Sequence, residues 1–194
     1  MQMSAASILR WIAIALWLAT VVVCLSLYAY DPQAFSSDKM VFFLSRFEGE
    51  ILLIYCFFSV VRGFTLLPST PLVIAGTILY PHQPWLVLFI SLSGILLSSS
   101  MIYFFSDFLG FTDYFERKHA SFIHKTKDRL EKPLGLFFVF LWALCPFVPT
   151  DVVCYVAGTS KMSFLKFIAA VGFGELLLCS FYIFFGGMIF GKIT

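Results

Sequence analysis

One cationic side chain stands inside a long apolar stretch: Arg62, six residues before Pro68. An arginine at the centre of a membrane helix costs about 2.5–3.5 kcal/mol to insert, so it must face the protein interior or water and find a partner. The candidate partners are Asp151, which follows a second proline-rich break, and Glu175, which lies in the last apolar block. We interpret Arg62 as a candidate binding group for an anion. A structural ion pair without a role in turnover is the alternative.

The acidic residues are candidates for other roles. Glu175 could exchange a proton, because burial disfavours the charged form of a carboxylate. A hydrogen-bonded structural glutamate is the alternative. Glu48 and Glu50 precede the apolar block that contains Arg62. We expect these two near the membrane surface, where they are solvated or guard the entry to a cavity.

Two apolar blocks are broken by prolines, which cannot continue a helix. The four prolines at these breaks are Pro68, Pro71, Pro146 and Pro149. Freed backbone groups, together with the helix N-termini that follow each break, could hold an anion such as a phosphate headgroup. Gly76 and Gly158 lie in the segments after the breaks, where we expect small residues to permit close helix packing.

The sequence lacks the motifs of common enzymes, including GxSxG, the P-loop and GxGxxG. Its five cysteines have no metal-ligand spacing, and its three histidines form no HExxH pattern, so we expect no metal and no other cofactor. No basic face is large enough to follow nucleic-acid phosphates. We therefore expect neither an enzyme nor a nucleic-acid-binding protein.

The composition predicts an all-α membrane protein. Of 194 residues, 60% are hydrophobic and 12% are charged, whereas soluble domains carry about 25% charged residues. The same values exclude intrinsic disorder, which requires low hydrophobicity and high charge.

Five apolar blocks set the expected organisation. Residues 1–44 form an N-terminal transmembrane helix (8–30) and a polar connector, and residues 45–194 form one domain. The expected elements of this domain are hairpin one (48–80), a transmembrane helix (85–106), an interfacial amphipathic helix (112–132), hairpin two (133–158) and a last helix (164–190). The segment 107–132 holds six of the 13 lysines and arginines, which places it on the cytoplasmic side.

Hairpin two is predicted from its length. Its arms, 133–145 and 151–158, reach about 20 Å and about 12 Å as helices, whereas the hydrocarbon core is about 30 Å thick. Neither arm can cross the membrane, and basic residues flank both ends. We therefore expect a re-entrant hairpin whose irregular tip is buried in protein or lines a wet cavity.

An internal repeat extends this prediction to hairpin one. Gly94–Phe105 and Gly174–Phe185 share six of twelve residues, at an offset of 80. Leu67–Thr70 resembles Val148–Asp151 at an offset of 81, and Glu175 takes the place of Ile95. Each copy combines a hairpin, which returns to its own side, with one crossing helix. The second copy is therefore inverted, an arrangement with which many transporters build a substrate site near the midplane.

The two breaks and their flanks resemble the VTT domain of the DedA superfamily, also called SNARE-associated Golgi protein, nearer its Golgi-vesicle branch. The residues that carry this resemblance are Arg62, Pro68, Ala75, Gly76, Pro146, Pro149, Asp151, Tyr155, Ala157, Gly158, Phe164, Phe167 and Gly172. The resemblance implies hairpins that enter from opposite leaflets and movement of lipids, as in phospholipid scramblases or flippases of polyprenyl phosphates. It implies functional roles for Arg62 and Asp151, and for Glu48 or Glu50. The chain departs from the family at Ala143, where an arginine is usual, and at Pro149, where bacterial DedA proteins have a second arginine.

Three functions remain open on the sequence. The first is a lipid transporter with a polar groove between the hairpins. The second is a proton- or cation-coupled carrier of a small solute that uses Asp151 and Glu175, and the third is a non-transporting membrane-organising scaffold. The expected partners are membrane lipids and protons. The sequence leaves open the oligomeric state and the choice between a bacterial inner membrane and a eukaryotic endomembrane.

Overall fold

The computed structural model describes residues 5–47, 49–108, 125–146 and 148–186, and every regular element in these ranges is helical. The elements are α1 (Ala5–Tyr30), η1 (Pro32–Phe35), α2 (Ser37–Ser45), α3 (Ile51–Val61), η2 (Arg62–Thr65), α4 (Thr70–Leu79), α5 (Pro84–Phe108), α7 (Pro133–Leu144), α8 (Thr150–Thr159), α9 (Phe164–Ser180) and η3 (Phe181–Phe185). A further helical stretch covers residues 125–130. Of the predicted interfacial helix, residues 112–124 lie outside the described ranges.

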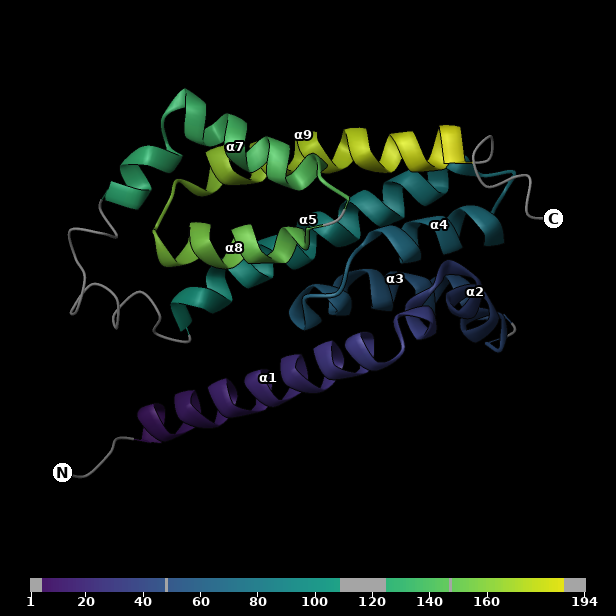
Figure 1. Ribbon diagram of the computed structural model, residues 1–194, viewed down its shortest axis with the longest axis horizontal. Coiled ribbons are helices and arrows are strands. Elements are labelled where there is room, and N and C mark those ends of the chain that lie inside the picture. The colour runs from purple at the N-terminus through teal and green to yellow at the C-terminus, as the bar shows by residue number, and fades with distance from the viewer. Residues whose placement is uncertain (1–4, 48, 109–124, 147, 187–194) are drawn as a thin grey trace.

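Three long helices, α1, α5 and α9, run along the long axis of the molecule (Figure 1). Within the described residues, α1, α5 and α9 together with η3 provide three stretches long and apolar enough to cross a membrane, Trp11–Tyr30, Pro84–Ser106 and Phe164–Gly186. Helix α1 covers residues 8–30 and α5 covers residues 85–106, and α9 continues through the π-helical turn η3. The protein is an all-α membrane protein.

Local sequence explains where several helices begin and end. The chain leaves α1 at Asp31, whose side chain accepts a hydrogen bond from the Ala34 N–H at 3.2 Å and caps the 3₁₀ turn η1. Both α5 and α7 begin with a proline, Pro84 and Pro133. A proline is favoured at the first helical position, because its fixed φ suits the helix and its missing N–H would be unpaired there.

Two pairs of short helices turn back halfway along the molecule. Hairpin one consists of α3, η2 and α4, and hairpin two of α7 and α8. At 10 to 12 residues, these α-helices are about 15–18 Å long, against about 30 Å for a hydrocarbon core. Hairpin one extends inward from the end near the C-terminus and hairpin two from the opposite end (Figure 1). Their tips therefore lie near the middle of the long axis.

Equivalent close contacts hold each hairpin against its long helix. A Cβ added to Gly94 of α5 would stand 2.6 Å from Ser59 Cβ of α3. A Cβ added to Gly174 of α9 would stand 2.7 Å from the Phe140 carbonyl oxygen of α7. The pairs are offset by 80 and 81 residues, the offsets of the sequence repeat. The two halves thus share one packing arrangement.

The connector between α1 and hairpin one contains a packed helix that the sequence analysis did not predict. Leu44 of α2 is buried in an apolar cluster with Tyr55 of α3 and with Leu72 and Ala75 of α4. The side chain of Leu44 fills the space beside hairpin one. The connector therefore contributes to the core of the domain.

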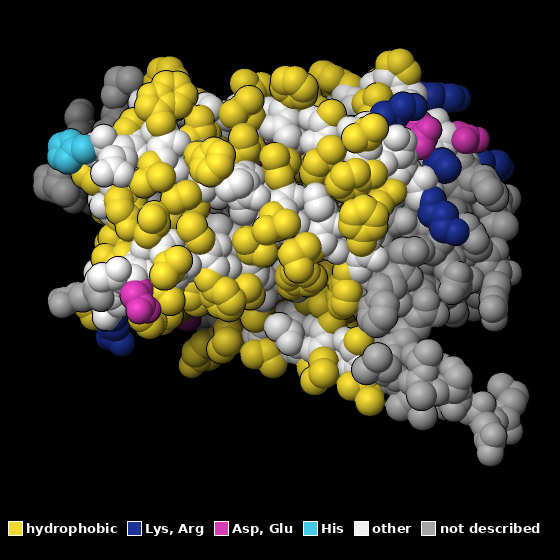
Figure 2. All heavy atoms as spheres, turned by 180° about the vertical axis from the view of Figure 1, so that it is seen from behind, with side chains coloured by type: hydrophobic (Ala, Val, Ile, Leu, Met, Phe, Trp, Pro, Cys, Tyr) yellow, Lys and Arg dark blue, Asp and Glu magenta, His cyan; other side chains and the backbone are white. Residues whose placement is uncertain are grey.

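The outer surface is apolar between two charged ends. Figure 2 shows hydrophobic side chains over most of this face, with lysines and arginines gathered at the end formed by residues 125–132 and the start of α9. Only 6% of the apolar stretch of α1 is buried inside the protein. A continuous exposed apolar surface of this kind is typical of a protein embedded in lipid.

Candidate functional site

Arg62 lies at the tip of hairpin one. It ends α3 and begins η2, after which Leu66 adopts a left-handed conformation with φ of 58° and redirects the chain toward Pro68. The Arg62 side chain is 8% exposed. Its Nη1 donates a hydrogen bond to the Leu67 carbonyl at 3.4 Å, whereas its Nη2 has no hydrogen-bond partner.

Asp151 faces Arg62 from the other hairpin. Its Oδ2 lies 3.8 Å from Arg62 Nη1, which is longer than the 2.7–2.9 Å or so of a charge-assisted hydrogen bond. Asp151 occupies the first turn of α8, where the helix dipole favours a negative charge. The carboxylate comes this close because Gly63 has no side chain: a Cβ at Gly63 would stand 3.2 Å from Asp151 Oδ1.

Glu175 joins the same cluster through Thr150. The Thr150 hydroxyl is hydrogen-bonded to Glu175 Oε1, and Thr150 precedes Asp151 at the start of α8. Glu175 is 0% exposed, and its Oε2 has no hydrogen-bond partner. The structure therefore brings together three sequence-predicted residues, Arg62, Asp151 and Glu175, from hairpin one, hairpin two and α9.

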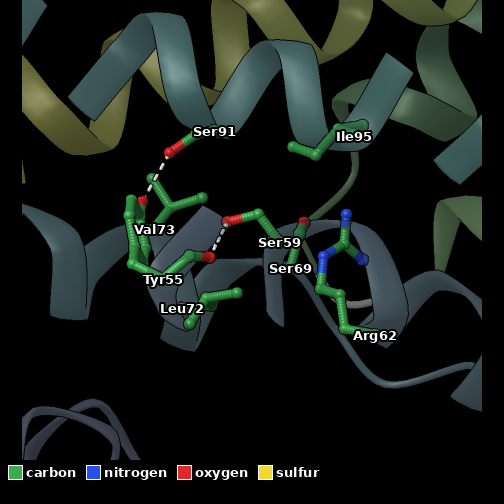
Figure 3. A pocket seen from close by; sticks show the side chains of 8 residues that line it. All are labelled: Tyr55, Ser59, Arg62, Ser69, Leu72, Val73, Ser91 and Ile95. Carbon is green, nitrogen blue, oxygen red and sulfur yellow. Dashed lines mark hydrogen bonds between the residues drawn. The ribbon is translucent and has the colours of Figure 1, made fainter. Parts of the chain in front are cut away.

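Arg62 borders two cavities. The larger, of about 230 Å³, lies between hairpin one and the segment from the end of α1 to α2, and Arg62 is the charged residue in an otherwise mostly apolar lining. The smaller, of about 10 Å³, is at the lower limit of the volume that can hold one water molecule. Figure 3 shows that Ser59, Ser69 and Ser91 surround the smaller cavity together with Arg62. The Arg62 guanidinium thus borders one small cavity with a polar lining and one larger cavity with a mostly apolar lining.

The hydroxyl groups around Arg62 were not predicted as site residues. Tyr55 of α3 is fully buried, and its hydroxyl is hydrogen-bonded to that of Ser91 of α5 at 2.7 Å. Ser59 donates to the Tyr55 carbonyl at 2.8 Å. Serine and tyrosine within apolar helices are the sequence signal that could have identified this polar lining.

The predicted glutamates of hairpin one are not part of the cluster. Glu50 is exposed immediately before α3, whereas Arg62 lies at the other end of that helix. Glu48 lies outside the described residues. The structure thus separates Glu50 from Arg62 by the length of α3.

The predicted prolines and glycines make different contacts within the hairpins. Pro68 and Pro71 line the larger cavity, and the Pro149 carbonyl accepts a hydrogen bond from the Trp142 indole at 3.2 Å. Pro146 lies in the link between α7 and α8. Gly76 packs against the Tyr55 ring, and Gly158 packs against Ser106 and Tyr103 of α5.

Position 143, where the family resemblance predicts an arginine, belongs to the core. Ala143 is fully buried on α7, and a Cβ at Gly174 would stand 2.7 Å from its Cβ. The contact between α7 and α9 leaves no room for a longer side chain here. At an offset of 81 residues, Ala143 is the counterpart of Arg62, so the cation occurs in the first copy of the repeat alone.

These features define a helical membrane protein with an ion pair between two oppositely directed hairpins. The family model of the VTT domain matches residues 67–188, and the chain belongs to this family. The match includes Asp151 and Glu175 and begins five residues after Arg62. No curated protein matches the chain. No solved structure matches it either.

Proposed function

We propose that this protein is a multi-pass transporter that moves phospholipid or polyprenyl-phosphate lipid between membrane leaflets, in the manner of a scramblase or flippase and without chemical conversion. The observation that carries this proposal is the position of Arg62, which lies where the hairpin tips meet and borders the 230 Å³ cavity. A guanidinium is suited to phosphate, and the apolar lining is suited to acyl or prenyl chains. The site therefore matches both parts of such a lipid.

The arrangement of the helices supports a multi-pass topology. In this proposal α1, α5 and α9 cross the membrane, and both hairpins re-enter from opposite sides because their helices are too short to cross. The charged side chains at the ends of the molecule (Figure 2) then lie at the two membrane surfaces. Arg62 and Asp151 meet within the hydrocarbon layer, where a passing headgroup needs polar partners.

Arg62 has a donor available for a phosphate. Its contact with Asp151 is 3.8 Å long, and Nη2 is unpaired in protein. A phosphate oxygen could therefore bind Nη2 while Asp151 continues to balance the charge. The carboxylate limits how tightly the headgroup is held, which a transporter requires for release.

The experiment is lipid exchange in liposomes that contain the purified protein and a fluorescent phospholipid or polyprenyl phosphate. A membrane-impermeant quencher reports the rate at which the labelled lipid reaches the outer leaflet. Arg62→Ala should slow exchange about ten- to hundredfold, which corresponds to the about 1.5–3 kcal/mol of a hydrogen bond to a charged group. Arg46→Ala, at an exposed arginine beside the Phe42 ring, is the matched control and should leave the rate unchanged.

The outcome also separates the other two functions. No exchange above protein-free liposomes would exclude lipid transport. Solute uptake that follows a pH gradient and is lost in Glu175→Gln would instead favour the coupled carrier. A scaffold predicts that Arg62→Ala retains cellular function, whereas deletion of residues 112–132 removes it.

A further inference from the structure

The buried cluster contains more acid groups than bases. Among the residues that the structure describes, three ordinarily charged side chains are buried: Arg62, Asp151 and Glu175. If all three were ionised, the cluster would carry a net charge of −1. An uncompensated charge in the interior is far more costly than a neutral hydrogen-bonded group. One more positive charge is therefore required at this site.

The two carboxyl groups have different surroundings. Asp151 has the Arg62 guanidinium at 3.8 Å and the N-terminus of α8, both of which favour its charged form. Glu175 has the neutral Thr150 hydroxyl on Oε1. One oxygen of each carboxyl group, Asp151 Oδ2 and Glu175 Oε2, has no hydrogen-bond partner, but at Asp151 that oxygen is the one nearest to the Arg62 guanidinium. Because Glu175 forms no such ion pair, its unpaired oxygen is tolerated better in a neutral carboxyl group than in a carboxylate.

Among the described residues, the groups that face Glu175 from its neighbours supply no second cation. Titratable groups that interact with it are Arg62 of η2, Cys154 and Asp151 of α8, and Cys179 of α9 itself. The cysteines are buried and free, and as neutral thiols they add no charge. On the α7 side, the facing residue near Gly174 is Ala143.

We propose that this cluster is a binding site for one proton, held by Glu175 against the Thr150 hydroxyl. The neutral glutamic acid keeps the hydrogen bond between its Oε1 and the Thr150 hydroxyl, and Asp151 remains ionised opposite Arg62. Loss of the proton would place a second carboxylate beside Arg62, where it competes with Asp151 for the guanidinium. Because Asp151 belongs to hairpin two and Arg62 to hairpin one, proton occupancy regulates the contact between the hairpins.

This proposal concerns the same cluster as the proposed lipid path, and its regulatory consequence rests on that function. The proton itself is measured without lipid exchange, so the two proposals can fail separately. The experiment is infrared spectroscopy of the full chain at neutral pH in bilayers of ether-linked phospholipid, which lack ester carbonyls. The carbonyl stretch of a protonated carboxyl group is then observed directly.

In the unaltered chain we expect one protonated-carboxyl band that shifts when glutamate carries ¹³C in its carboxyl group and stays fixed when aspartate is labelled. This measurement needs no substitution and is therefore independent of folding defects. No such band, or a band that shifts with labelled aspartate, would overturn the proposal.

Substitutions test the charge balance. Glu175→Gln should remove the band, and Asp151→Asn should remove it as well, because Glu175 then ionises to pair with Arg62. Arg62→Gln should raise the number of protonated carboxyl groups from one to two. Glu50→Gln, at an exposed position, is the control and should leave the band unchanged. Retention of the band in Glu175→Gln or Asp151→Asn, or no gain in Arg62→Gln, contradicts the proposal.

Discussion

Arg62 Nη1 and Asp151 Oδ2 lie 3.8 Å apart, although the two residues are 89 positions apart in sequence and belong to different hairpins. Arg62 caps the C-terminus of α3 in hairpin one, whereas Asp151 lies in the first turn of α8 in hairpin two. This pair links the two copies of the repeat at their tips. A movement that separates the two hairpin tips must therefore break this ion pair or replace one of its partners.

Neutralising Arg62 alone should destabilise the protein more than neutralising Arg62 and Asp151 together. Arg62→Met leaves buried acid without its cation, at an expected cost of about 3 kcal/mol. The double variant Arg62→Met, Asp151→Asn removes the second charge and should recover most of that loss. Unfolding in detergent measures both variants. Additive losses in the double variant would show that the two side chains do not interact.

The glycine contacts of α9 give a matched pair of variants. Gly174→Ala should destabilise the protein by about 1–3 kcal/mol, because the new Cβ would stand 2.7 Å from Ala143 Cβ and overpack the interface. At Gly172 the nearest atom would be 3.4 Å away, so Gly172→Ala should be neutral or stabilise by up to about 1 kcal/mol. Thermal unfolding distinguishes the two, and equal effects would argue against the close approach of α7 and α9.

Glu131, near the basic end of the molecule, should make stability depend on pH. The Ser163 backbone N–H donates a hydrogen bond to Glu131 Oε1 at 2.8 Å, and Lys166 Nζ lies 3.4 Å from Oε2. The Ser163 hydrogen bond, followed by the Lys166 charge, lowers the pKa of Glu131. Because the pKa of Glu131 is lower in the folded state than in the unfolded state, its charged form stabilises the protein at pH values above the unfolded-state pKa. This contribution disappears as the pH falls through the folded-state pKa.

In the variant Glu131→Gln, the free energy of unfolding should therefore depend less on pH in the acid range. Its loss of stability should be largest near neutral pH and should vanish in acid, as measured by unfolding across pH. Glu50→Gln, at an exposed acid, is the control. A pH profile for Glu131→Gln that runs parallel to that of the unaltered chain would exclude this contribution.

The contact between α1 and α8 should control access to the larger cavity. The Trp17 and Tyr155 rings lie 5.1 Å apart between centroids, and an aromatic pair contributes about 0.5–1.5 kcal/mol. Because α1 forms part of the cavity wall, Trp17→Ala should loosen α1 and speed lipid exchange about two- to tenfold. Trp11→Ala, at a residue 63% exposed, is the control. Slower or unchanged exchange in Trp17→Ala would mean that α1 is not a movable wall.

Much of the architecture could be predicted from local patterns. The three long apolar helices follow from the length of the apolar blocks, and the breaks at Pro68 and Pro149 follow from the lost helical hydrogen bonds. The short arms of hairpin two follow from the small number of residues between its proline break and its polar flanks. The helix α2 was missed, because its single buried residue, Leu44, gives no strong periodic signal.

The sequence by itself determined that this chain is a membrane protein, that its apolar blocks break at prolines, and that Arg62 needs an acidic partner. Each of these depends on composition, on spacing or on the cost of a charge in hydrocarbon. The tertiary structure decided that Asp151 is that partner, that Thr150 holds Glu175 nearby, and that Glu50 lies apart. Such relationships depend on helices distant in sequence, whose relative positions are set by close packing at Gly63 and Gly174.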